Sequence, residues 1–83
     1  MRMNGWFVYI LRCRDGTLYT GIAVDLERRV EAHRRGVGAK YTRGRCPVTL
    51  AYHERQPDRS RALRREAAIR RLGRAAKLAL IAH

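Results

Sequence analysis

Residues 6–33 constrain the fold more than any other part of the chain. The segment WFVYILRC is rich in aromatic and β-branched residues, which is typical of a strand. An R-D-G-T turn follows, and residues 17–23 read as a returning strand, so the two segments predict an antiparallel hairpin. Asp25 stands where a helix N-cap is expected, and the spacing predicts a helix to about Arg35, ended by Gly36.

The turn of this hairpin admits two registers, which place the strand tyrosines differently. A two-residue Asp-Gly loop would put Tyr9 and Tyr19 on opposite faces of the sheet. A three-residue loop with Gly16 in the left-handed conformation would put both on one face, with Tyr9 opposite Gly21. The sequence allows both, and we favour the second. Gly21 would then leave open space beside Tyr9 that a substrate backbone could occupy.

The rest of the chain predicts a small α+β fold. Residues 36–45 form a glycine-rich basic loop expected to lack regular structure, and residues 47–54 alternate as a third strand. Helices are expected over 59–72 and 74–82. The predicted fold is a small three-stranded antiparallel-type sheet, a β-hairpin plus a third strand, flanked by helices in the order β-β-α-β-α-α. We expect a single domain over residues 1–83, near the lower size limit for a self-sufficient core.

The charge of the chain indicates a polyanionic partner. Nineteen Lys and Arg against seven Asp and Glu give a formal charge of +12 on 83 residues. Most of the cations are arginine, whose planar guanidinium suits phosphate oxygens, so nucleic acid is the expected partner. No apolar run approaches the roughly 20 residues of a membrane span, and the N-terminal residues lack a signal-peptide pattern. We therefore expect a cytoplasmic protein with no membrane association.

Polar side chains fall at positions that should face the core, where they are costly unless paired. Arg29 and His33 lie on or beside the apolar stripe of the first helix, and Glu66 lies within that of the helix over 59–72. In one explanation Arg29 pairs with Glu66 inside the core and His33 bonds a tyrosine hydroxyl. In the other, these residues and the two strand tyrosines form a site open to solvent. Their convergence favours a site, while spacing by itself leaves both explanations open.

Five short motifs follow one another along the chain: F-V-Y at residues 7–9, Y-T-G at 19–21, D-L-E-R-R-V-E-A-H at 25–33, G-A-K-Y-T-R-G-R-C-P-V-T-L-A-Y-H-E at 38–54 and L-R-R-E-A-A-I at 63–69. In order and spacing they resemble the GIY-YIG nuclease family, specifically its small single-domain bacterial branch, from about Trp6 to Ile81. Three features depart from the family pattern. Phe7-Val8 replaces a glycine and an isoleucine, Thr20 stands where an apolar residue is usual, and no asparagine follows Asn4, although many family nucleases use a late one near the metal.

The resemblance implies a catalytic site on the residues that match the motifs: the tyrosines Tyr9 and Tyr19, the glycine Gly21, the arginine Arg29, the histidine His33 and the metal-binding glutamate Glu66. It also implies metal-assisted hydrolysis of DNA phosphodiester bonds, with Mg²⁺ or Mn²⁺ held by Glu66. One tyrosine would take a proton from the attacking water with help from His33. A phenol titrates at about pH 10, so positive charge must favour the phenolate or the proton must pass to His33. Either tyrosine could be the base, and a hydrogen bond from His33 would favour Tyr9.

Further cations are candidates for contact with phosphate: Lys40, Arg43, Arg45, Arg64 and Arg71. Tyr41 could stack on a base or serve in packing. Taken together, the sequence predicts a metal-dependent endonuclease acting on DNA in repair or processing, with selectivity for DNA structure as one form of that activity. The alternative is a nucleic-acid-binding module with little or no cleavage.

Overall fold

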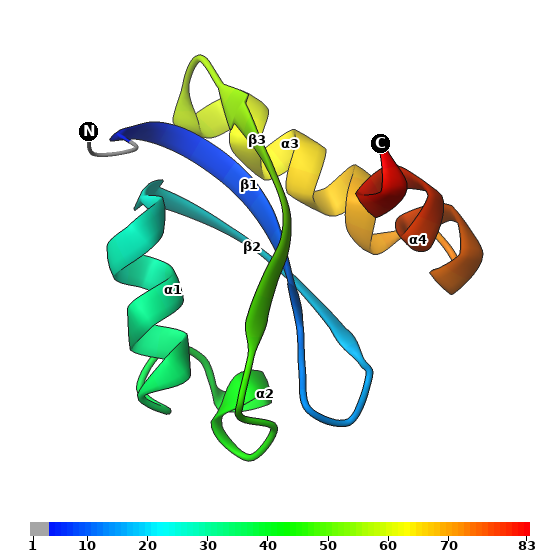
Figure 1. Ribbon diagram of the computed structural model, residues 1–83. Helices are drawn as coiled ribbons and strands as arrows, with labels where there is room; N and C mark the ends of the chain where they lie inside the picture. Colours follow the sequence, from blue (N-terminus) through cyan, green and yellow to red (C-terminus); the bar gives the residue numbers. More distant parts are fainter. Residues whose placement is uncertain (1–3) are drawn as a thin grey trace.

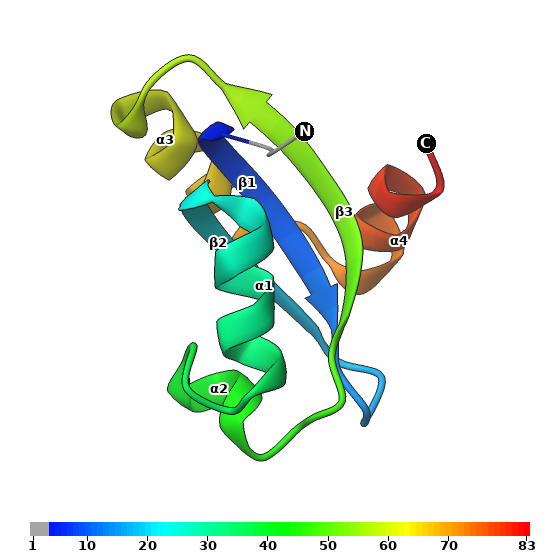
Figure 2. The same ribbon diagram turned by 60° about the vertical axis from the view of Figure 1, so that its left-hand side comes forward.

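The computed structural model describes residues 4–83, and the strand β1 (Asn4–Arg12) lies at its centre. β2 (Leu18–Asp25) and β3 (Thr49–Gln56) pair with its two edges, both antiparallel, in the order β2-β1-β3. The helices are α1 (Leu26–Arg34), α2 (Lys40–Arg43), α3 (Arg59–Arg70) and α4 (Arg74–Ala82). α1 and α2 lie on one side of the sheet and α3 and α4 on the other, as Figures 1 and 2 show. The predicted α+β fold, a three-stranded antiparallel sheet flanked by helices, is confirmed.

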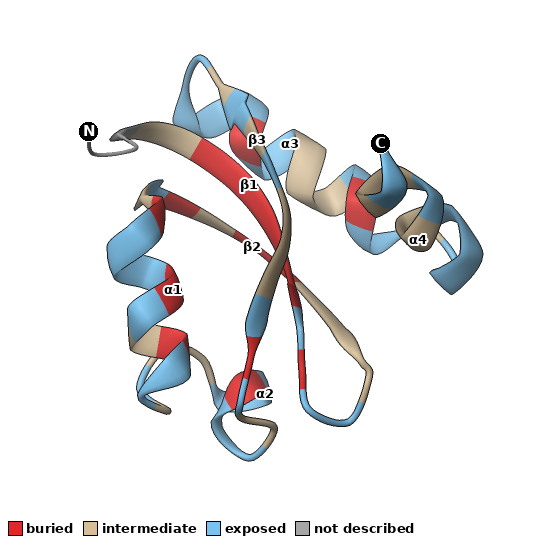
Figure 3. Ribbon diagram, in the orientation of Figure 1, coloured by how far each residue is buried: buried red, intermediate tan, exposed pale blue. Residues whose placement is uncertain are grey.

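The central strand is buried on both faces because helices cover the sheet on each side (Figure 3). Alternate residues of a strand face opposite sides, so β1 contributes to two cores. The core under α1 contains Phe7, Tyr9, Leu11, Ala23, Leu26 and Val30. The core under α3 and α4 contains Val8, Ile10, Ala62 and Ile69. Tyr9 is therefore a component of the α1 core as well as a candidate site residue.

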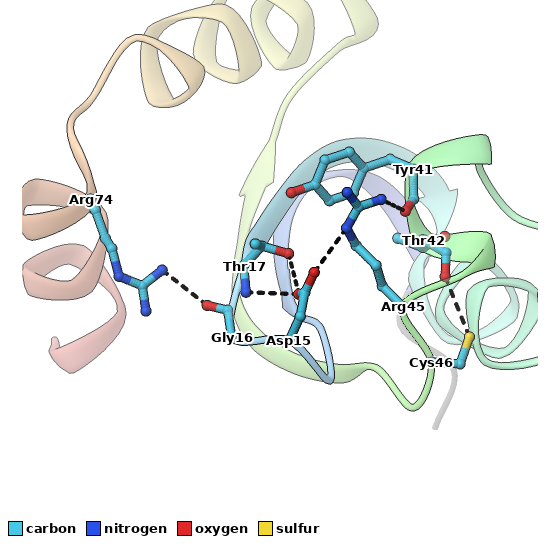
Figure 4. A network of polar contacts seen from close by, with 8 residues as sticks. All are labelled: Asp15, Gly16, Thr17, Tyr41, Thr42, Arg45, Cys46 and Arg74. Atoms are coloured by element: carbon cyan, nitrogen blue, oxygen red, sulfur yellow. Dashed lines mark hydrogen bonds and ion pairs between the residues drawn. The ribbon is translucent and has the colours of Figure 1, made fainter.

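The hairpin adopts the three-residue loop. Tyr9 stands opposite Gly21, and Gly16 has a φ of 84°, the left-handed conformation expected for this turn. The Asp15 carboxylate accepts hydrogen bonds from the backbone N–H and hydroxyl of Thr17 at 3.1 and 2.6 Å. Arg74 Nη1 donates to the carbonyl oxygen of Gly16 at 2.9 Å and so ties α4 to the loop (Figure 4). This register places Tyr9 and Tyr19 on one face of the sheet.

The helix starts follow the expected capping chemistry. Asp25 Oδ1 accepts from the backbone N–H of Arg28 at 3.1 Å, and Asp58 Oδ1 accepts from that of Arg61 at 2.8 Å. After α1, Gly36 has a φ of 79° and turns the chain away from the helix. The starts of α1 and α3 and the end of α1 therefore follow from local sequence.

One element of the predicted order was missed. Residues 40–43, placed in an irregular loop by the sequence analysis, form the helical turn α2, so the observed order is β-β-α-α-β-α-α. At its start the Thr42 hydroxyl donates to Ala39 O at 3.1 Å, and at its end Arg45 Nη1 donates to Tyr41 O at 2.7 Å. These side-chain bonds satisfy carbonyl groups of a turn too short to be stable alone. Within residues 4–83, no helix combines the length and the apolar character that crossing a membrane requires.

Candidate active site

Two tyrosines and a histidine converge in the core under α1. Tyr9 Oη lies 2.8 Å from His33 Nε2, a hydrogen-bond distance. The Tyr19 ring centroid is 5.2 Å from that of His33 and 6.4 Å from that of Tyr9. We call these three residues, contributed by β1, β2 and α1, the Tyr9–His33 cluster. The structure thus brings together three of the predicted site residues.

Two members of the cluster are closed to solvent, so the expectation of an open site is wrong for them. Tyr9 and His33 are each 0% exposed, whereas Tyr19 is half-buried. Two glycines lie in close contact with Tyr9 and His33. A Cβ at Gly21 would lie 2.6 Å from Tyr9 Oη, and one at Gly38 would lie 2.5 Å from His33 Nδ1. The space expected beside Tyr9 at Gly21 is therefore filled by the Tyr9 phenol itself.

Thr42 contacts Nδ1 of His33 and so influences which ring nitrogen carries the proton. Its Oγ1 lies 2.8 Å from His33 Nδ1 and donates its only hydrogen to Ala39 O at 3.1 Å. With the Thr42 hydrogen on Ala39 O, the hydroxyl accepts from Nδ1–H, and in this tautomer Nε2 is unprotonated and accepts from the hydroxyl of Tyr9. Sequence reasoning missed Thr42. Its signal was a small hydroxyl residue within the basic G-A-K-Y-T-R-G-R motif.

The protonation states agree with this hydrogen-bond chain. Burial raises the pKa of Tyr9 to about 12, although a hydrogen bond from Arg29 and its positive charge act in the opposite direction. Burial, with a smaller effect of the Arg29 charge, lowers the pKa of His33 to about 4. At pH 7 the cluster therefore holds a neutral phenol and a neutral imidazole. The environment disfavours both a stable Tyr9 phenolate and a proton held on His33.

Arg29 and Glu66 approach the cluster from different elements. Arg29, on α1, is exposed, so its predicted inward position is wrong. Its side chain still reaches the buried Tyr9, because a hydrogen bond from Arg29 and its positive charge both act to lower the pKa of that phenol. Glu66, on α3, has a side chain 16% exposed and pairs with Arg70 Nη2 at 3.1 Å, where the paired-core explanation expected Arg29. The negative charge of Glu66 raises the pKa of Tyr9, so it acts on the same cluster.

Comparison with known proteins identifies the family. Residues 5–79 match the family model of the GIY-YIG catalytic domain. The chain belongs to the GIY-YIG family. The resemblance inferred from the five motifs is confirmed, and it places the chain in a nuclease family whose members bind nucleic acid and generally use divalent metals.

The relatives of this GIY-YIG chain include UPF0213 proteins. It is 55% identical to the UPF0213 protein VNG_2274C of Halobacterium salinarum over 73 residues, covering 88% of this chain and 95% of that one. It is 53% identical to a UPF0213 protein of Staphylococcus aureus over 79 residues, covering 95% and 96%. The solution structure of the UPF0213 protein BH0048 from Bacillus halodurans is 43% identical, with a TM-score of 0.60 over 93% of this chain and 82% of that one. That of EF2693 from E. faecalis is 39% identical, with a TM-score of 0.62 over 93% and 83%.

The donor groups of this GIY-YIG domain fit a cation that takes few protein ligands. Among residues 4–83, no three His, Cys, Asp or Glu side chains are grouped as metal ligands. Mg²⁺ commonly uses one or two carboxylates and completes its shell with water and substrate phosphate. The partly buried carboxylate of Glu66 matches that requirement if Arg70 turns away from it. Glu66 is therefore the residue that would hold the ion.

The predicted phosphate-contact residues of this GIY-YIG domain fall into two groups. Four are exposed on α2, on α3 or directly after α3: Lys40, Arg43, Arg64 and Arg71. Arg45 is instead engaged, because its Nε donates to Asp15 Oδ2 at 3.0 Å and its guanidinium lies 4.1 Å from the centre of the Tyr41 ring (Figure 4). Tyr41 also stacks on Tyr19, with ring centroids 5.6 Å apart. Both Arg45 and Tyr41 thus serve in packing between α2, the hairpin loop and the cluster.

Proposed function

We propose that this protein is a metal-dependent endonuclease that hydrolyses DNA phosphodiester bonds in DNA repair or processing. The observation that carries the proposal is the 2.8 Å hydrogen bond between the Tyr9 hydroxyl and Nε2 of His33, with the Arg29 cation acting on Tyr9. Tyr9 can take a proton from an attacking water and give its own hydroxyl proton to His33 in the same step. The phenolate, which burial disfavours, then never has to exist as a separate species.

Each remaining group has a role that its position supports. Arg29, which is exposed and interacts with Tyr9, would bind a non-bridging phosphate oxygen and stabilise the negative charge that develops there. Glu66 would hold Mg²⁺ or Mn²⁺, which when bound supplies Lewis-acid stabilisation of the phosphate and the leaving oxygen. Tyr19 is half-buried beside His33 and would orient the water or the phosphate. The water oxygen forms a bond to phosphorus, the bond to the leaving oxygen breaks, and the water proton enters the Tyr9–His33 pair.

The test uses purified protein with Mg²⁺ or Mn²⁺ on supercoiled, branched, nicked and single-stranded DNA. We expect nicking or cutting by the wild type. Glu66→Gln and Arg29→Ala should each lower the cleavage rate about 100-fold or more while leaving DNA binding largely intact. Two exposed positions, Glu31 on α1 and Arg35 directly after it, supply controls with the same charge changes: Glu31→Gln and Arg35→Ala should cleave like the wild type.

The complete burial of Tyr9 and His33 favours a second function, a nucleic-acid-binding module with little cleavage. A module of this kind would bind DNA through its basic surface without exposing the cluster. Binding without cleavage on every substrate, with the Glu66→Gln variant matching the wild type in affinity, would establish this second function in place of the first.

A further inference from the structure

The outer edge of β2 carries two cavities, one on each side of Gly21. β2 is an edge strand of the described sheet, so its outer side is not covered by another strand. One cavity, which we call the Trp6 cavity, has a volume of about 470 Å³ and is lined by Trp6, Ile22, Val24, Arg28 and Arg29 among others. The other, the Tyr41 cavity, has a volume of about 300 Å³ and is lined by Leu18, Tyr19, Thr20, Tyr41, Arg70 and Lys77. The Tyr9 phenol packs on Gly21 between them.

The distance between the cavities suits a short run of nucleotides. Tyr19 lines one cavity and Ala23 the other, four positions apart on the strand. At about 3.3 Å per residue, these positions are separated by about 13 Å. That length corresponds to about four stacked nucleotides at roughly 3.4 Å each, and to fewer when the strand is extended.

Both cavities offer the same two kinds of contact. The Trp6 cavity combines an indole with the guanidinium groups of Arg28 and Arg29, and the Tyr41 cavity combines two phenols with Arg70 and Lys77. Aromatic rings beside cations are the usual means of binding unpaired nucleotides, whose bases contact the rings while the phosphates contact the cations. Each cavity has the size of a small-molecule site, which suits one nucleotide better than a duplex.

The Tyr41 cavity also contains a polar group that lacks a partner. Thr20 is 4% exposed. Within residues 4–83, its Oγ1 is buried and has no hydrogen-bond partner. Buried hydroxyls are almost always bonded, so a ligand atom is a reasonable partner for this one. Arg70, by contrast, already donates to Thr20 O at 3.0 Å and to Glu66. Lys77 is therefore the cation of this cavity best placed to take a phosphate.

We propose that a single strand of DNA lies along the outer edge of β2, with nucleotides on either side of the cleaved bond seated in the Trp6 and Tyr41 cavities. The inference rests on the proposed nuclease function, since it places the cleaved phosphate at Arg29 and Tyr9. It also moves the main contacts away from the five cations predicted from the sequence, none of which lines either cavity. Lys77, Arg28 and Trp6 become the residues that determine strand binding.

The test measures binding of a single-stranded 12-nucleotide DNA by fluorescence anisotropy in EDTA, where no metal-dependent cleavage occurs. The chain contains two lysines, which gives a matched comparison. Lys77→Ala should weaken binding about fivefold and lower the slope of log affinity against log salt by about 1, as expected for a lost phosphate contact. Lys40→Ala, which removes the same charge from exposed α2, should change affinity less than about twofold. Equal effects of the two changes would overturn the proposal.

Trp6 provides a second measurement, because it is the single tryptophan of the chain. Binding of the oligonucleotide should quench its emission, and unchanged emission at saturation would also overturn the proposal. Hydrolysis of bis(p-nitrophenyl) phosphate by the wild type tests the nuclease function separately, since this small diester has no neighbouring nucleotides. If the wild type hydrolyses the diester but the two lysine variants bind DNA equally, the proposed function stands and the strand path is wrong. If the wild type does not hydrolyse the diester but Lys77→Ala weakens DNA binding more than Lys40→Ala, the strand path stands and the proposed function is wrong.

Discussion

Acidification should destabilise this fold through one buried imidazole. Burial and the Arg29 charge lower the pKa of His33 from 6.5 to about 4. The other side chains that face the imidazole are Tyr9 from β1, Tyr19 from β2 and Thr42 from α2. Protonation of His33 in the folded protein would place a second positive charge near Arg29 and break the hydrogen bond from the Tyr9 hydroxyl. His33 therefore binds a proton more weakly in the folded protein than in the unfolded chain.

The sign of the effect follows from the two pKa values. Between pH 6.5 and 4 the unfolded chain holds more protons than the folded one, so the free energy of unfolding falls as the pH falls. The stability is complete above about pH 6.5 and is lost progressively toward pH 4. With these values, His33 accounts for a loss of about 2 kcal/mol between pH 7 and 5, and about 3 kcal/mol by pH 4.

Urea denaturation at pH 7, 6 and 5 measures this loss. The wild type should lose about 2 kcal/mol from pH 7 to 5, and His33→Gln less than about 0.5 kcal/mol, whatever its stability at pH 7. His53→Gln, at an exposed position on β3, should behave like the wild type. Glu54 does not interfere: burial acts to raise its pKa, but hydrogen bonds from Arg65, Tyr52 and Gln56 lower it below 4.5, so its contribution is lost at lower pH.

The reasoning fails if wild type and His33→Gln lose the same stability between pH 7 and 5. In that case another group takes up the proton, or solvent reaches the imidazole. Should His33→Gln not fold, titration of the His33 ring protons by NMR in the wild type decides the matter. A midpoint near the ordinary value of 6.5 would contradict the buried, neutral imidazole on which the proton relay depends.

Two further substitutions test how the cluster is held. Thr42→Val leaves Nδ1–H of His33 buried without an acceptor and should lower the free energy of unfolding by about 1–3 kcal/mol in urea denaturation, whereas Thr42→Ser should restore most of it. Equal stability of the valine and serine variants would refute a stabilising hydrogen bond between Thr42 and His33. Gly38→Ala puts a Cβ 2.5 Å from His33 Nδ1 and 2.9 Å from its backbone nitrogen, and should cost about 1–3 kcal/mol in thermal or urea unfolding. Gly44→Ala, which has no atom within 4 Å of the added Cβ, is the matched control, and a similar cost there would contradict the packing argument.

The fold could be predicted because its decisive signals are local. The R-D-G-T turn and the alternation of apolar residues specify the hairpin, and Asp25 and Asp58 specify the helix starts. α2 was missed because its four residues have no helical pattern of their own. It is held by the Thr42 and Arg45 side chains, which bond carbonyl groups at its two ends.

The sequence predicted which residues come together in the Tyr9–His33 cluster, but the expectation that this cluster is open to solvent was wrong for Tyr9 and His33. Placing Tyr9, Tyr19 and His33 together needs only the hairpin register and the face of one helix. The burial of Tyr9 and His33 depends on which distant backbone segments pack against their rings, and a local sequence pattern does not specify this. Gly21 was expected to create space, and instead it allows the hydroxyl end of the Tyr9 ring to pack closely against the strand. Gly38 does the same for His33 from a loop whose path no sequence pattern predicts.

The low pKa of His33 also constrains how the proposed relay can operate. With a pKa of about 4, His33 is a poor proton acceptor at pH 7, where holding a proton would cost about 4 kcal/mol. Part of that cost comes from the positive charge of Arg29. A phosphate bound to Arg29 would offset this charge, so the substrate itself should raise the pKa of His33 and make it a better acceptor. The relay would then be strongest when a phosphate occupies the site, and a rise in the His33 midpoint on adding a non-hydrolysable dinucleotide in the NMR titration would show it.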